Sequence, residues 1–249
     1  MLIIDIFIII FGLILGSFFN VVAIRLLNKE SIVFPPSHCI YCKHQLHAFD
    51  LIPVFSYIFL KGKCRYCKSP VSLLYALGEL LTAVSILFVY KNVGVNLELI
   101  PALLLTILLV ISVLTDIREQ LILDIVTLPM VGLLIISRLF IGTEPFLYYL
   151  IGGAAGFLLL LFLAIVSKGG MGGGDIKLYA AIGVALGPLL TVMSLVLASF
   201  VGAIAGIFLM MTGRVKKGQP IAFGPSIFIG TLVAYVYGNE ILDWYISFW

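Results

Sequence analysis

Residues 97–116 of the chain read LELIPALLLTILLVISVLTD, and this stretch decides the class of fold. Apart from Glu98 near its start and Asp116 at its end, it carries no charged side chain. About 20 consecutive apolar residues are enough for a helix to cross the hydrocarbon core of a bilayer. The stretch therefore predicts a membrane-spanning helix that ends in a carboxylate.

The composition of the whole chain agrees with this prediction. Of its 249 residues, 62% are hydrophobic and only 11% are charged, and the mean hydropathy is +1.22. Soluble domains average roughly 45–50% apolar and about 25% charged residues, so an ordinary soluble enzyme, a disordered chain and a secreted disulfide scaffold are excluded. We expect an all-α, polytopic membrane protein in which seven or eight helices of about 20 residues cross the bilayer.

Eight apolar runs are the expected spans. The first, residues 6–24, is predicted to be a retained span and not a signal peptide, because Asp5 stands where a signal peptide carries positive charge and no Lys or Arg precedes Arg25. Gly187 and Pro188 must form a very short turn between the sixth and seventh runs. The other runs lie approximately at residues 73–90, 97–115, 121–141, 146–166, 176–190, 191–211 and 221–237.

The distribution of basic residues predicts the orientation, since short cytoplasmic loops collect Lys and Arg. With the N-terminus outside, the outer segments hold only Lys91 and Arg138. The inner segments then hold Arg25, Lys29, Lys43, Lys61, Lys63, Arg65, Lys68, Arg118, Lys168, Lys177, Arg214, Lys216 and Lys217. This division of 13 to 2 favours eight spans with both termini outside the cytoplasm, because a missed span would put the later basic clusters on the opposite face.

Pairs of glycines four residues apart occur in three of the expected spans. Such spacing lets membrane helices approach closely, although glycine is also simply common in these helices, and both interpretations stay open. The pairs are Gly12 and Gly16, Gly152 and Gly156, and Gly202 and Gly206.

The polar stretch between the first two spans, about residues 25–72, contains every cysteine of the chain. Two CxxC motifs, 21 residues apart, have nearly the spacing of a four-cysteine zinc site. The expected cytoplasmic position disfavours disulfides, so we predict a structural zinc ion with no open coordination position. The predicted ligands are Cys39, Cys42, Cys64 and Cys67. The histidines of the same loop are expected to be surface residues or neighbours of the ligands, although one of them could replace a cysteine: His38, His44 and His47.

Five carboxylates are not explained by loops or termini. Ionisable groups at membrane depth are costly and suggest a functional site. Asp116 ends the third span and Asp175 opens the sixth, so both are expected at the cytoplasmic edge, where two close carboxylates can act together as base and acid. Alternatively, Asp116 could pair with Arg118, and Asp175 could cap a helix or pair with Lys177. The remaining members of the set are Glu79 in the second span, Glu119 and Asp124.

A glycine-rich run precedes Asp175. Without Cβ atoms, these residues would let an extended substrate backbone approach the carboxylate. A phosphate cradle is the competing interpretation, but no Gly-Lys-Ser/Thr follows and an Asp stands where an anion would bind. The run contains Gly169, Gly170, Gly172, Gly173 and Gly174, and the last three form the predicted substrate-binding loop.

These motifs resemble those of the type IV prepilin peptidases, which are membrane aspartyl proteases with a GxGD motif. The resemblance covers nearly the whole chain and is closest to competence-type members. It departs from the family at Leu123 and Ala222, where proline is usual. The segments that carry it are GSFFNVVAIRL at 16–26, PSHCIYCKHQL at 36–46, DLIPVFSYIFLKGKCRYC at 50–67, GELLTA at 78–83, DIREQLILD at 116–124, GGGDIKL at 172–178 and AFGP at 222–225.

The resemblance implies an endopeptidase of the bacterial cell membrane that removes the short basic leader from type IV prepilin or pseudopilin precursors at the cytoplasmic face. Asp116 and Asp175 would be its catalytic aspartates. It also implies a division into an N-terminal region with the zinc loop, residues 1–95, and a peptidase membrane domain, residues 96–249. Membrane lipids are expected partners, and nucleic acid is not.

Methylation of the new N-terminal amine with S-adenosylmethionine is implied by the resemblance alone, because no GxGxxG nucleotide loop follows a strand. Glu79 could contribute to this reaction, or it could be a helix-packing carboxylate bonded to a neighbouring hydroxyl. Two other classes of protein stay open on the residues: a proton-coupled transporter that uses the same carboxylates, and a membrane scaffold whose zinc loop recruits a partner.

Overall fold

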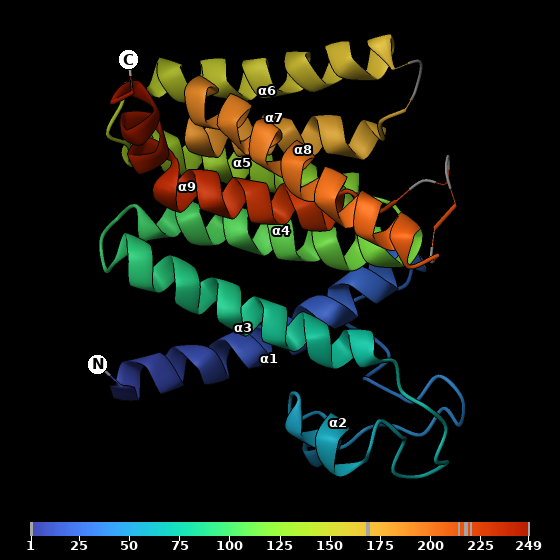
Figure 1. The fold of residues 1–249 in the computed structure, drawn as a ribbon. Helices are drawn as coiled ribbons and strands as arrows, with labels where there is room; N and C mark the ends of the chain where they lie inside the picture. The colour runs from blue at the N-terminus through green and yellow to red at the C-terminus, as the bar shows by residue number, and fades with distance from the viewer. Residues whose placement is uncertain (1, 168–169, 214, 217–218, 220, 249) are drawn as a thin grey trace. The chain divides into compact units, whose positions relative to one another are not determined.

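The structure is a computed structural model that describes residues 2–167, 170–213, 215–216, 219 and 221–248. Within these residues the chain is helical and has no β-strand beyond two isolated bridges. Figure 1 labels the helices. Their bounds are α1 Leu2–Leu27, η1 Ala48–Asp50, α2 Phe55–Phe59, α3 Leu73–Val93, α4 Leu99–Glu119, α5 Asp124–Phe140, α6 Phe146–Val166, α7 Gly173–Leu186, α8 Pro188–Met211 and α9 Gly224–Ile246.

The predicted all-α membrane class is confirmed. In the part of the chain that the structure describes, eight helices of 14 residues or more overlap the eight predicted ranges, and α6 has the predicted bounds. Five of them are long and apolar enough to cross a membrane: α1, α3, α4, α6 and α8. The number of crossings stays a prediction.

Several predicted boundaries were wrong by a few residues. The sixth run ends at Leu186 and not at residue 190, because Gly187 adopts a φ of +78° and Pro188 begins α8. Gln120, with a φ of +52°, ends α4, so α5 begins only at Asp124. A positive φ suits glycine and strains most other residues, which is why the predicted turn at Gly187 forms where it does. The last helix, α9, continues to Ile246, beyond the predicted end at residue 237.

The chain forms two compact units, Met1–Phe88 and Val89–Trp249. In the first unit, α1 and α3 touch through their backbones. A Cβ atom added at Gly12 would lie 2.7 Å from Cα of Ala83, and one added at Gly16 would lie 2.6 Å from Cα of Glu79. The side-chain amide of Asn20 then donates to the carbonyl oxygen of Tyr75 at 2.9 Å. The first glycine pair therefore serves close helix packing.

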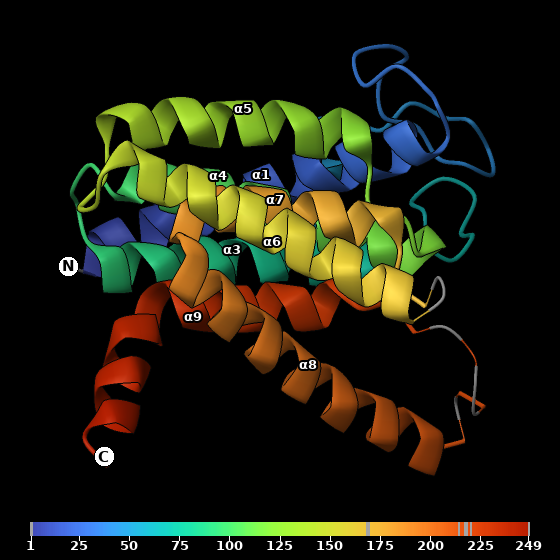
Figure 2. The same ribbon diagram turned by 90° about the horizontal axis from the view of Figure 1, so that it is seen from above.

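The second unit is built around the short helix α7, which contacts α4, α5, α6 and α8 (Figure 1). Its surface is largely covered, and Leu178, Tyr179 and Ile182 are fully buried. Gly152 and Gly156 of α6 allow this contact, since Cβ atoms there would meet carbonyl oxygens of α7 at 2.3 Å. Figure 2 shows the second half of α8 leading away from α6.

A buried charged cluster lies at the end of α7 that is remote from Asp175. Arg138 of α5 is 4% exposed and donates to Oε2 of Glu98 at 2.7 Å. It also donates to the carbonyl oxygen of Ala185 and lies 4.4 Å from the ring centroid of Tyr149. Tyr235 of α9 donates to Oε1 of Glu98 at 2.6 Å. The sequence placed Arg138 in an outer segment and Glu98 near the start of the third span without linking them, yet together they join α4, α5, α7 and α9.

Candidate functional site

Asp116 lies in the last turn of α4 and is 7% exposed. Its Oδ2 accepts a hydrogen bond of 2.6 Å from the backbone N–H of Gly224, and the backbone of Phe223 also hydrogen-bonds the carboxylate. Phe223 is the N-cap of α9. Backbone N–H groups at a helix N-terminus favour a negative charge, so the end of α4 and the start of α9 together fix this carboxylate.

Asp175 lies in the first turn of α7 and is partly exposed. Its carboxylate hydrogen-bonds the backbone of Gly172, the N-cap residue, so the predicted helix-capping contact exists. It also lies within electrostatic range of the Asp116 carboxylate. The two carboxylates that the sequence singled out therefore lie close enough to interact electrostatically, although 59 positions separate them in the chain.

Lys177 pairs with Asp124 and not with Asp175. Its Nζ lies 2.5 Å from Oδ2 of Asp124, and both side chains are about half exposed. The pair joins the first turn of α5 to the second turn of α7. Of the sequence alternatives for Asp175, the pairing with Lys177 is therefore wrong, and Asp175 keeps no basic partner among the described ion pairs.

The predicted glycine loop has two structural roles in addition to any role toward a substrate. A Cβ atom at Gly174 would lie 2.7 Å from Cβ of Ile122, so this glycine is needed for packing. A Cβ atom at Gly172 would lie 3.1 Å from Oδ2 of Asp175. Gly173 faces open space. The neighbouring predictions for Lys168 and Gly169, like those for Arg214 and Lys217, lie outside the described residues.

The two departures from the family pattern leave this geometry in place. Leu123 is the N-cap of α5 with an extended backbone, and Asp124 still opens the helix. Ala222 precedes Phe223 and Gly224, and the amide of Gly224 still reaches Asp116.

The four cysteines of the loop converge. Their sulfur atoms lie within 4.8 Å of one another, and none forms a disulfide. The two CxxC motifs fold alike: the N–H groups of Lys43 and Lys68 donate to the carbonyl oxygens of Cys39 and Cys64 at 2.9 and 3.0 Å. Among the described residues, the group that could hold a metal ion consists of these four cysteines and includes no histidine.

Thiolates are favoured at part of this cluster. Burial raises the pKa of Cys39, but hydrogen bonds from the Cys42 and Tyr41 backbones and from the neighbouring thiols outweigh it and lower the pKa to about 6. The Sγ atoms of Cys39 and Cys67 lie 3.8 Å apart. Tetrahedral zinc with Zn–S bonds of about 2.3 Å separates its sulfurs by about 3.8 Å, so the residues fit that ion.

Aromatic and charged side chains support the second CxxC motif. The ring of His44 stacks on Tyr66 with a centroid distance of 3.7 Å. Asp50 accepts hydrogen bonds from Nε of Arg65 at 2.5 Å and from the hydroxyl of Tyr66 at 2.9 Å. Burial raises the pKa of Asp50, but these bonds and the His47 N–H outweigh it and hold the pKa below its usual range. As predicted, His44 and His47 lie near the cysteines without belonging to the cluster.

Glu79 is 7% exposed on α3. Its Oε2 accepts a hydrogen bond of 2.7 Å from the backbone N–H of Val54, and the carboxylate also hydrogen-bonds the side chain of Ser17. The contacts of Glu79 therefore agree with the interpretation as a helix-packing carboxylate that is bonded to a neighbouring hydroxyl. The bond to Val54, which ties the cysteine-bearing loop to α3, has no sequence signal.

Comparison with known proteins identifies the family. Residues 10–93 match the bacterial peptidase A24 N-terminal domain, and residues 103–207 match the type IV leader peptidase family. A prepilin leader peptidase/N-methyltransferase of Bacillus subtilis is 39% identical over 96% of each chain. Proteins of the same name from Aeromonas salmonicida and Pseudomonas aeruginosa are 35% and 33% identical, over 95% and 96% of this chain and 92% of each relative. No solved structure matches.

The chain belongs to the type IV leader peptidase family. The resemblance seen in the sequence is thereby confirmed, and the relatives match along nearly the full length of both chains.

Proposed function

We propose that this protein is a membrane-embedded aspartyl endopeptidase that removes the short basic leader from type IV prepilin-like precursors. The proposal is supported by the electrostatic interaction between Asp116, at the end of α4, and Asp175, at the start of α7, in a member of a leader peptidase family. The names of the relatives support the same substrate class.

In the proposed reaction, one ionised carboxylate takes a proton from the water that attacks the scissile carbonyl. The other, protonated carboxylate donates to the developing oxyanion and helps the amine to leave. Asp116 suits the ionised role, because it accepts backbone hydrogen bonds at the N-terminus of α9. Asp175, whose carboxylate has one backbone hydrogen bond where Asp116 has two, suits the proton donor.

The orientation follows from the basic residues. Eight spans with both termini outside would put the cysteine-bearing loop, Asp116 and Asp175 on the cytoplasmic face, together with the 13 Lys and Arg residues of the inner segments. A precursor with a basic leader and an apolar helix would present its cleavage site at that interface. The acidic residues Asp116, Glu119, Asp124 and Asp175 would attract the leader locally.

Zinc is the proposed ion of the cysteine cluster. Cys39, Cys42, Cys64 and Cys67 would hold it, and four thiolates leave no open position for catalysis. Its contribution would be to close the two CxxC motifs into one structure.

Methyl transfer is the second proposed activity, because the relatives carry N-methyltransferase in their names. S-adenosylmethionine, when bound, would supply the methyl group for the N-terminal amine that cleavage exposes. We assign this activity to residues 1–95 and the peptidase to residues 96–249, in line with the two family matches at 10–93 and 103–207.

The test incubates membranes that contain the protein with a prepilin-like precursor. Removal of the leader is detected as a decrease in the mass of the precursor. Asp116→Asn and Asp175→Asn should each abolish cleavage while membrane levels stay normal. Glu240→Gln is the matched control, since Glu240 is an exposed carboxylate in the last third of α9 and outside this acidic group, and it should cleave normally. Undiminished cleavage by either Asp variant would remove that residue from the pair, and proton-coupled uptake without cleavage would favour a transporter.

A further inference from the structure

The short helix α2 of the cysteine-bearing loop has an apolar face that the rest of the loop does not cover. Residues three and four positions apart share one side of a helix, which places Phe55, Ile58 and Phe59 together. These side chains are 55%, 62% and 81% exposed. Ser56 and Tyr57, on the other side of α2, are partly covered. The apolar face of α2 is therefore not used to pack the loop.

A hydrogen bond fixes the level of α2 along α3. Val54, the N-cap of α2, donates its backbone N–H to Oε2 of Glu79 at 2.7 Å, and α2 lies at the level of the first turns of α3 in Figure 1. Glu79 follows the first residue of α3, Leu73, by six positions, which is about 9 Å along the helix axis. The chain therefore enters α2 beside the body of α3 and not beyond its end.

This part of α3 is suited to lie in the bilayer. The helix has 21 residues and is apolar enough to cross a membrane. Its length of about 31 Å matches the hydrocarbon core of about 30 Å. Its first two turns also leave Leu73, Leu77 and Leu80 exposed. Two elements of the first unit thus present apolar side chains at the same level, where a lipid phase would cover both.

The turn that leads into α2 has a defined geometry. The N–H of Phe55 donates to the carbonyl oxygen of Pro53 at 2.6 Å, and Val54 between them has a φ of +61°. This is the positive-φ form of a γ-turn, which is rare and strained, above all for a β-branched residue. Such a conformation persists where surrounding contacts determine it. The bond to Glu79 is a contact of this kind, so α2 is held at its level.

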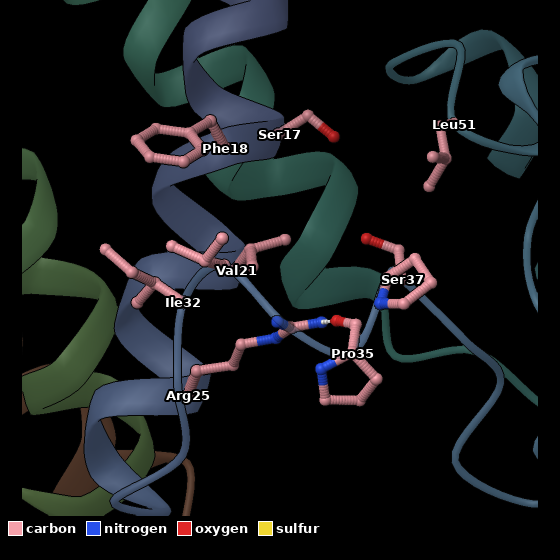
Figure 3. Close-up of a pocket in the computed structure, with 10 residues that line it drawn as sticks. Ser17, Phe18, Val21, Arg25, Ile32, Pro35, Ser37 and Leu51 are labelled. Atoms are coloured by element: carbon pink, nitrogen blue, oxygen red, sulfur yellow. Dashed lines mark hydrogen bonds between the residues drawn. The ribbon is translucent and has the colours of Figure 1, made fainter.

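The start of the loop is attached to α1 in a similar way. The guanidinium of Arg25 donates to the carbonyl oxygens of Ser31 at 2.9 Å and Pro35 at 2.5 Å. Figure 3 shows the bond to Pro35, which holds the loop against the second half of α1. The loop is therefore fixed both to the helix that precedes it and to the helix that follows it.

Basic side chains follow the apolar face directly. Lys61 and Lys63 come just after α2 and are exposed, and in the part of the chain that the structure describes no ion pair includes either of them. Residues 28–72 contain six Lys and Arg but only two Asp and Glu. One of these acids, Asp50, already pairs with Arg65. An apolar helix face beside basic residues is typical of helices that lie in the interface of an anionic membrane.

We propose that α2 is an interfacial membrane anchor. Phe55, Ile58 and Phe59 enter the boundary between acyl chains and headgroups, and Lys61 and Lys63 bind the phosphates of anionic phospholipids. Interfacial helices bury their apolar face about 5–10 Å deep, which agrees with the level of α2 along α3. The anchor holds the cysteine-bearing loop against the bilayer. It goes beyond the proposed cleavage and methyl transfer and depends on neither.

Tryptophan fluorescence tests which face of α2 meets the lipid. The two native tryptophans are replaced by phenylalanine, and Phe59→Trp is introduced into the full-length chain in lipid nanodiscs. Phosphatidylcholine with brominated acyl chains should quench at least about half of the emission, because the ring lies at the acyl-chain boundary. Tyr57→Trp is the matched control on the other side of α2, where the Tyr57 hydroxyl lies next to Gly62, and it should lose less than about a fifth.

Labelled lipids test the charge of the partner. Energy transfer from the tryptophan of Phe59→Trp to dansyl-labelled phosphatidylglycerol should exceed transfer to dansyl-labelled phosphatidylcholine about twofold, since each Lys near the surface attracts anionic lipid. Lys61→Gln combined with Lys63→Gln should remove this difference. Lys91→Gln, at the opposite end of α3, should preserve it.

Ile58→Trp is a second variant and should be quenched like Phe59→Trp, and each variant is compared only when it unfolds at the wild-type temperature. Equal quenching of Phe59→Trp and Tyr57→Trp would overturn the anchor, as would quenching of Phe59→Trp and Ile58→Trp by aqueous acrylamide in place of the brominated lipid. Loss of lipid quenching when a prepilin-like precursor is added would show that the face binds protein and would also overturn it. Equal transfer to the two labelled lipids would overturn the role of Lys61 and Lys63.

Discussion

The backbone N–H of Gly224 lies 2.6 Å from Oδ2 of Asp116, although 108 positions separate the two residues in the chain. The contact joins the last turn of α4 to the first turn of α9. Any side chain at position 224 would collide with the carboxylate, since an added Cβ would lie 2.8 Å from the same oxygen.

Gly224→Ala should therefore displace Asp116 and reduce precursor cleavage at least about 100-fold, because small displacements of catalytic groups cost roughly that factor. Gly132→Ala is the matched control. Gly132 also lies in a helix of the second unit, but an added Cβ there meets nothing within 4 Å. Cleavage assays on both variants at equal membrane levels decide the point, and normal activity of Gly224→Ala would show that the contact does not position Asp116.

The ion pair of Lys177 and Asp124 should matter little. Both side chains are about half exposed, at 40% and 51%, and exposed pairs contribute about 0–1 kcal/mol. Lys177→Met should thus lower cleavage less than about fivefold, with α7 still held by its buried contacts. A loss comparable to that of Asp175→Asn would instead show that Lys177 contacts the substrate.

The ion pair between the buried Arg138 and the partly exposed Glu98 should stabilise the second unit. Removing one partner leaves a buried charge uncompensated, which costs about 3 kcal/mol or more. Glu98→Gln should accordingly lower the free energy of unfolding in detergent by about 3 kcal/mol. Asp124→Asn, which breaks the half-exposed pair with Lys177 in the same unit, is the comparison and should cost less than about 1 kcal/mol. Both variants are measured by thermal or denaturant unfolding. Equal losses of the free energy of unfolding would show that burial does not make the Arg138 pair the stronger one.

Zinc should depend on both CxxC motifs. Cys39→Ser and Cys64→Ser should each abolish bound zinc, because both sulfurs belong to one cluster and the two motifs have the same backbone contacts. Metal content by mass spectrometry and maleimide labelling of the remaining cysteines measure this. In the native protein all four thiols should resist labelling until a chelator is added, and rapid labelling of zinc-free protein straight from membranes would refute the metal site.

Much of the fold was predictable from the sequence because it depends on local properties. Long apolar runs form helices wherever they meet lipid, since each helix satisfies its own backbone hydrogen bonds. Gly187 followed by Pro188 ends one helix and begins the next. The spacing of the cysteines likewise indicated a cluster, because each CxxC motif is a short local turn.

Contacts between distant residues were decided by the tertiary structure alone. The sequence suggested that Lys177 pairs with Asp175. The packing of α5 against α7 instead places Lys177 beside Asp124. It contained no signal that Glu98 neutralises Arg138, that Val54 bonds Glu79, or that Gly224 reaches Asp116. The sequence determined which residues carry charge near the membrane edge. Only the packing of the helices determined their partners, because partner choice depends on distances that local residue patterns do not encode.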